Sequence, residues 1–81
     1  MTRDQAIRAI FDEISAAEAK HGAFPEDIIH CAAIVAEEAG ELVQAAIDFH
    51  YCHDEAQTDV QKEAIQTAAM AIRFLLEVCR E

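Results

Sequence analysis

Hydrophobic residues recur along this chain with the spacing of an α-helix, in three long segments separated by turns. The first segment predicts a helix from about Thr2 to His21. Thr2 and Gln5 form a capping-box pattern at its start, and Gly22 follows its last turn. One side of this helix carries Arg3 and an apolar stripe of ordinary width. The stripe consists of Ile7, Ile10, Phe11, Ile14 and Ala17.

The second predicted helix begins near Pro25, where Glu26 and Asp27 suit the N-terminal end of the helix dipole, and continues to about Phe49. Its apolar residues cover so wide an arc that they must contact more than one neighbouring helix. Its polar residues are confined to an arc of roughly 120°, and they are His30, Glu37, Glu38, Glu41, Gln44 and Asp48.

The third predicted helix runs from about Thr58 to Arg80. Thr58 with Gln61 forms a second capping-box pattern at its start, and Asp54 is an earlier alternative cap. The helix again has a polar stripe along one side and an apolar remainder. The stripe consists of Asp59, Lys62, Glu63, Gln66, Arg73 and Glu77, with Met70 among them.

The turn between these two helices, near Tyr51–Ala56, is short enough for an antiparallel hairpin. Positions 38 and 66, like positions 41 and 63, lie symmetrically about position 52. At a rise of ~1.5 Å per residue, Glu38 is then level with Gln66, and Glu41 with Glu63. The pattern therefore predicts that the two polar stripes meet in one oxygen-rich site.

Composition agrees with an all-α fold, because the chain has two Gly, one Pro and abundant Ala. Its 81 residues predict a single domain, residues 1–81. Yet 53% of them are hydrophobic, which is more than a small monomer usually hides. We therefore expect a three-helix subunit that forms a helical bundle through oligomerisation.

Charge and cysteine content restrict the partners and the compartment. The net charge of −10 makes a nucleic-acid duplex or an anionic membrane an unfavourable partner. The sequence shows neither a signal peptide nor an apolar run of ~18 residues, the length that spans a membrane. Three cysteines without CxxC spacing are typical of a reduced, cytoplasmic protein.

Glu37, Glu38 and Glu41 lie on one helix and repel one another. Each like-charge pair one turn apart destabilises a helix by ~0.2–0.5 kcal/mol. No Lys or Arg occurs from His21 to Gln61 to compensate them. A divalent cation is the simplest compensation, and Mg²⁺ or Mn²⁺ prefers such oxygen ligands. A cation held there can neutralise phosphate charge and activate water, which a spare carboxylate can orient.

The spacing of these acids resembles a known family motif. Glu37-Glu38-x-x-Glu41, followed by Glu63-x-x-Gln66, is similar to the EExxE, spacer, ExxD motif of the MazG-like nucleotide pyrophosphohydrolases. The similarity extends from about Pro25 to Leu76. It implies an all-α fold, a homodimer or homotetramer, and Mg²⁺-dependent cleavage of a nucleoside triphosphate to monophosphate and pyrophosphate.

By this resemblance, Glu38, Glu41 and Glu63 are metal ligands, and Glu37 is an accessory acid that positions water or a ligand. Gln66 stands where the family has Asp. Its amide oxygen can coordinate a metal, but it carries no charge and should weaken metal binding.

Three further polar residues are candidates for substrate binding. His30 shares the polar stripe and suits contact with a nucleobase or phosphate, but a solvated histidine fits as well. Lys62 and Arg73 suit phosphate groups, although salt bridges to acids one turn away on the same helix, Asp59 and Glu77, are the favoured alternative.

Two other interpretations of the chain stay open. It can be a non-catalytic helical binding or regulatory module that keeps the fold, with or without a cation. It can also be a carboxylate-bridged di-metal bundle, although neither Glu38 nor Glu63 is followed by the expected His three residues on. The sequence His50-Tyr51-Cys52-His53 invites a zinc interpretation, but no second ligand pair has the right spacing.

Overall fold

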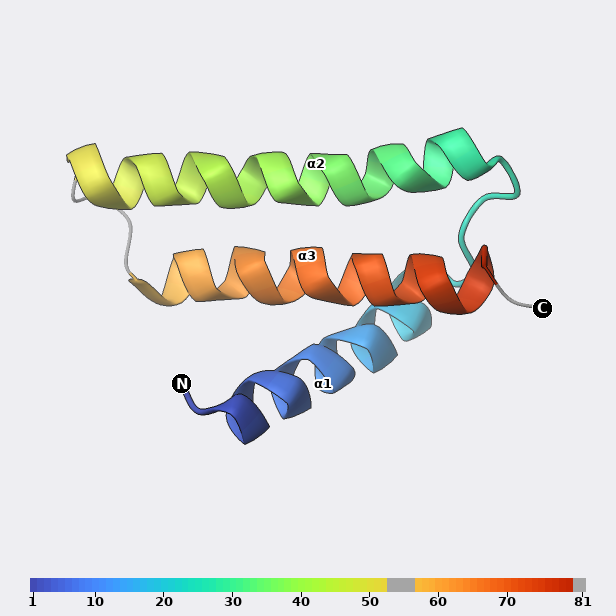
Figure 1. Ribbon diagram of the computed structural model, residues 1–81, viewed down its shortest axis with the longest axis horizontal. Helices are drawn as coiled ribbons and strands as arrows, with labels where there is room; N and C mark the ends of the chain where they lie inside the picture. The colour runs from blue at the N-terminus through green and yellow to red at the C-terminus, as the bar shows by residue number, and fades with distance from the viewer. Residues whose placement is uncertain (53–56, 80–81) are drawn as a thin grey trace.

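Three α-helices form the described structure, and α3 packs against both of the others. The computed structural model describes residues 1–52 and 57–79. The helices are α1 (Arg3–His21), α2 (Ile28–Ile47), which continues into a π-helical turn, η1 (Asp48–Cys52), and α3 (Gln57–Glu77). α2 and α3 lie side by side and antiparallel, while α1 crosses α3 obliquely (Figure 1). The predicted all-α fold and the antiparallel hairpin are confirmed.

The caps of α1 are those that the sequence predicts. The side-chain oxygen of Thr2 accepts from the backbone N–H of Gln5 at 3.2 Å, and the Gln5 side chain accepts from the N–H of Thr2 at 2.8 Å. At the other end, Gly22 has a positive φ of 69° and its N–H donates to the carbonyl of Glu18. A residue without Cβ adopts this conformation at little cost, so the chain can turn sharply away from α1.

The start of α2 differs from the prediction. The helix begins at Ile28 rather than Pro25, because Asp27 is its cap and accepts from the N–H of Ile29 at 2.9 Å. The residues between Gly22 and Asp27 form the connection from α1. The predicted end near Phe49 falls within the wider turn of η1.

The bounds of α3 shift by a few residues. It begins at Gln57, so Thr58 lies inside the helix and the capping box predicted for Thr58 and Gln61 is wrong. The last helical residue is Glu77. Its last turn closes with bonds from the N–H groups of Val78 and Cys79 to the carbonyl of Phe74. The alternative cap Asp54 and the predicted end at Arg80 lie outside the described residues.

The hydrophobic core is small and lies where α1 meets α3. Ile14 and Ala17 of α1 are buried there against Ala69 and Met70 of α3. Many large apolar side chains of the described residues remain exposed, including Ile7 and Phe11 on the predicted stripe of α1 and Ile28, Ile29, Val43, Ile47, Leu75 and Leu76 on the other two helices.

The subunit is also more extended than its length requires. Its radius of gyration is 13.5 Å, against about 12 Å for a compact chain of this size. Neither α1, α2 nor α3, as described, combines the length and apolarity needed to cross a membrane.

Candidate metal centre

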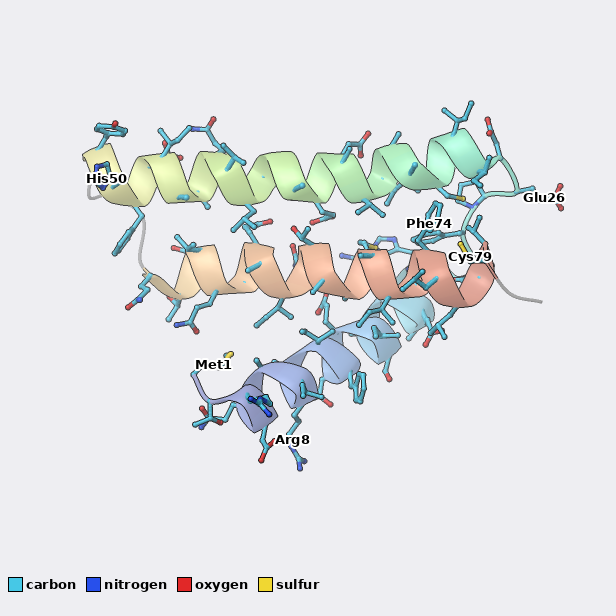
Figure 2. The ribbon with its side chains drawn as sticks, in the orientation of Figure 1. Met1, Arg8, Glu26, His50, Phe74 and Cys79 are labelled. Atoms are coloured by element: carbon cyan, nitrogen blue, oxygen red, sulfur yellow. The ribbon has the colours of Figure 1, made fainter. Side chains whose placement is uncertain are left out.

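The antiparallel packing of α2 on α3 brings three carboxylates together. Glu38, Glu41 and Glu63 each offer one side-chain oxygen, and these oxygens all lie within 4.8 Å of one another. Glu38 and Glu41 are one helical turn apart on α2, and Glu63 faces them from α3. Figure 2 shows side-chain oxygens in the space between these two helices. The predicted level pairing of Glu41 with Glu63 is confirmed.

Two of these carboxylates each bury an oxygen that has no partner. Glu38 and Glu63 are half-buried, and the Oε2 atom of each is shielded from solvent without a hydrogen bond among the described residues. A buried polar atom without a partner is costly to the fold. A cation bound between the helices would satisfy both oxygens at once.

The electrostatics of the cluster favour the uptake of positive charge. Burial raises the pKa of Glu38, and the nearby carboxylates of Glu41, Glu63 and Glu13 raise it further. Burial also raises the pKa of Glu63, as does the Glu41 carboxyl, while Lys62 acts in the opposite direction. The ionised forms of Glu38 and Glu63 are therefore less favourable than that of an ordinary glutamate. A bound proton or cation reduces the repulsion between the carboxylates.

A pocket of about 770 Å³ adjoins this cluster, with Glu38 in its wall. Gln66 lines the same pocket from α3, in keeping with its predicted position level with Glu38. The pocket therefore reaches the carboxylate cluster at Glu38 and also contacts Gln66, the fourth ligand that the sequence predicts. Its remaining lining comes from α1, the following loop and the two longer helices: Glu13, Ala16, Ala17, Lys20, His21, Ala23, Phe24, Pro25, Ile34, Met70 and Arg73.

The other predicted site residues lie around the cluster rather than in it. Glu37 is exposed and does not belong to the group of oxygens within 4.8 Å. His30 is exposed near the start of α2. Lys62 lines a shallower pocket with Glu41 and Glu63.

Arg73 is the most deeply buried charged residue described, with 2% of its surface exposed. Its Nε donates to Glu77 Oε2 at 3.1 Å, which confirms the predicted salt bridge. Its Nη2 donates to the carbonyl oxygen of Gly22, and its guanidinium lies 4.5 Å above the ring of Phe24. Arg73 therefore lines the pocket but directs its donors to the loop between α1 and α2.

Sequence reasoning did not bring α1 into the site. Glu13, Lys20 and His21 all line the pocket, although each looks like an ordinary surface residue of an amphipathic helix. The charge pattern of α1 gives no sign of their role. Only the crossing of α1 over α3 places them there.

The zinc interpretation gains no support from the described residues. Within them, Glu38, Glu41 and Glu63 form the group of ligand types close enough to hold a metal. The ring of His50 packs edge-on against Tyr51 at 4.6 Å between centroids. His53 lies outside the described residues.

Comparison with models of known protein families, with curated proteins and with solved structures gave no match for this chain. The resemblance to the MazG-like motif therefore stays a prediction.

Proposed function

We propose that this protein is a Mg²⁺-dependent nucleoside triphosphate pyrophosphohydrolase of the MazG-like type, cleaving an NTP or dNTP to the monophosphate and pyrophosphate. The observation that carries the proposal is the position of Glu38, which belongs both to the carboxylate cluster and to the wall of the large pocket. The pocket's volume, about 770 Å³, is in the range of small-molecule sites.

Each residue of the cluster has a distinct part in this proposal. Glu38, Glu41 and Glu63 hold Mg²⁺ or Mn²⁺, and the Gln66 amide oxygen completes the site as a neutral ligand. When bound, the ion neutralises phosphate charge and acidifies a bound water. Glu37, which is exposed on α2, is the accessory acid that positions water or a ligand.

The exposed apolar residues support a homo-oligomer, a dimer or a tetramer. Val43, Ile47, Leu75 and Leu76 leave 44–61% of their surface exposed in the single subunit. Covering such side chains with a second copy removes apolar surface from water. The free thiols of Cys31 and Cys79 suit the reducing cytoplasm that the sequence predicts.

The second candidate is a non-catalytic module that binds a cation. The substitution that favours it is Gln66, because the site then has one negative charge fewer than the family motif. Such a protein would bind the metal and release no pyrophosphate.

A panel of nucleoside and deoxynucleoside triphosphates with Mg²⁺, read out by pyrophosphate release, tests the enzyme proposal. We expect at least one substrate to react and Glu38→Gln to lose the activity. Glu26→Gln is the matched control, because Glu26 is exposed on the loop and points away from the helices (Figure 2). If no nucleotide reacts while the metal still binds, the non-catalytic module is the better description.

A further inference from the structure

Helix α1 contributes one acidic residue, Glu13, and two basic residues, Lys20 and His21, to the lining of the large pocket. Glu13 of α1 lines this pocket together with Glu38 of the carboxylate cluster. Lys20 and His21 also line the pocket. Lys20 lies seven positions after Glu13, which is ~10 Å along a helix. A ligand that reaches from the carboxylates along α1 would therefore meet positive charge.

We infer that Lys20 is the phosphate-binding cation of this pocket, and that it binds the polyphosphate of a nucleotide whose metal is held at Glu38. The inference rests on the proposed function, and it moves phosphate recognition from the predicted Lys62 and Arg73 to α1. A lysine suits this task, because its ammonium is a point charge on a flexible stem that can adapt to a phosphate chain.

The other cations near the site are less suitable. Arg73 lines the pocket, but it bonds to Glu77 and Gly22 and stacks on Phe24. Lys62 lies by Glu41 and Glu63 in a different pocket, and its charge acts on Glu63. Lys20, unlike Arg73, forms no ion pair within 4.0 Å with any described residue.

The loop that follows Lys20 is fixed to the other two helices. Arg73 of α3 donates to the carbonyl of Gly22, two residues after Lys20. Glu77 accepts the backbone N–H of Phe24 at 3.0 Å. The thiol of Cys31 on α2 donates to the carbonyl of Pro25 at 2.9 Å. These contacts tie the loop after α1 to α2 and α3 beside the pocket.

The test uses the whole protein with two probes: Mg²⁺ alone, and inorganic triphosphate with Mg²⁺ in excess. Calorimetry and thermal unfolding measure the binding of each probe to the wild type and to Lys20→Gln, Lys20→Arg and Arg8→Gln. Arg8→Gln is the matched control, because it removes one positive charge from the same helix. The Arg8 side chain points away from α3 (Figure 2). It lies 12 residues before Lys20, ~18 Å along the helix.

We expect Lys20→Gln to bind Mg²⁺ as the wild type does but to bind triphosphate about tenfold more weakly, the loss for one charge-assisted hydrogen bond. Lys20→Arg should keep most of the triphosphate affinity, and Arg8→Gln all of it. With an active substrate, Lys20→Gln should raise KM more than it lowers kcat.

The two proposals fail in different ways. Triphosphate affinity that is equal in Lys20→Gln and Arg8→Gln, or no triphosphate binding by the wild type, would overturn the role of Lys20. Absence of Mg²⁺ binding in the wild type would instead overturn the metal site of the proposed function. Triphosphate binding that still depends on Lys20 in that case would support the inference as a metal-independent anion site.

Discussion

Glu41 and Glu63 place side-chain oxygens within 4.8 Å of each other although 22 positions separate them in the sequence. This contact exists because the residues lie at equal distances from the turn between two antiparallel helices. With Glu38 it concentrates three acids at one point of the α2–α3 interface. The cluster is therefore the place where addition of a cation, a proton or a neutral side chain should have the largest effect.

Mg²⁺ or Mn²⁺ should raise the unfolding temperature, because a ligand that binds only the folded protein stabilises it by mass action. Glu41→Gln and Glu63→Gln should each lose most of this increase. Each variant should also unfold at a higher temperature than the wild type without metal, since one repulsive charge is gone. Thermal unfolding with and without metal measures both effects, with Glu26→Gln as control. A shift that survives in both variants would place the metal elsewhere.

Stability without metal should fall as the pH rises from mildly acidic to neutral. In the folded protein the pKa values of Glu38 and Glu63 are raised, chiefly by burial. The folded state therefore holds protons more tightly than the unfolded chain. The resulting stabilisation is fully present below the ordinary glutamate pKa and is lost as the pH rises through the raised values.

Unfolding curves between about pH 5 and about pH 7.5, recorded with a chelator, measure this dependence. Glu38→Gln should flatten the profile, and Glu26→Gln should leave it unchanged. Saturating Mg²⁺ should remove the loss near neutral pH. A wild-type profile that rises with pH in this window would contradict the assignment of the two glutamates.

Gln66→Asp should tighten Mg²⁺ binding, since it adds a negative charge on α3 beside the pocket wall that contains Glu38. If the protein is an enzyme, its activity should be kept or raised. Glu38→Gln should instead cost at least ~10²-fold in rate, because it removes a group that stabilises charge in the transition state. Metal titration and pyrophosphate release on both variants provide the comparison. Unchanged metal affinity in both would mean that the cluster is only a charged surface.

Arg73→Met should destabilise the protein by about 2 kcal/mol or more, because it removes the donor to Glu77 Oε2 and to the carbonyl of Gly22. Denaturant unfolding measures the loss. Arg8→Met on the exposed side of α1 is the matched control, and it should change stability by about 0.5 kcal/mol or less. Equal losses in the two variants would show that the buried contacts of Arg73 contribute little.

The protein should sediment as a dimer or a larger assembly at micromolar concentration. Val43, Leu75 and Leu76 are more than half exposed in the single subunit, and exposed apolar patches are typical of protein–protein interfaces. Leu75→Glu should weaken the assembly if this face forms the interface. Sedimentation velocity or light scattering provides the measurement. A well-folded monomer of 9.0 kDa would exclude the proposed oligomer.

The sequence by itself determined the three helices, the caps of α1 and the meeting of the carboxylates. Periodicity and capping act over a few residues, so Thr2, Gln5 and Gly22 could be assigned without tertiary information. The position of Glu41 opposite Glu63 followed from equal spacing about a short turn.

Only the tertiary structure decided how α1 joins the other helices, and with it the composition of the pocket. The angle at which one helix crosses another depends on how the side chains of both surfaces interlock, which no local pattern encodes. That packing buries Arg73 against the loop and places Glu13 and Lys20 in the wall of the pocket that Glu38 also lines.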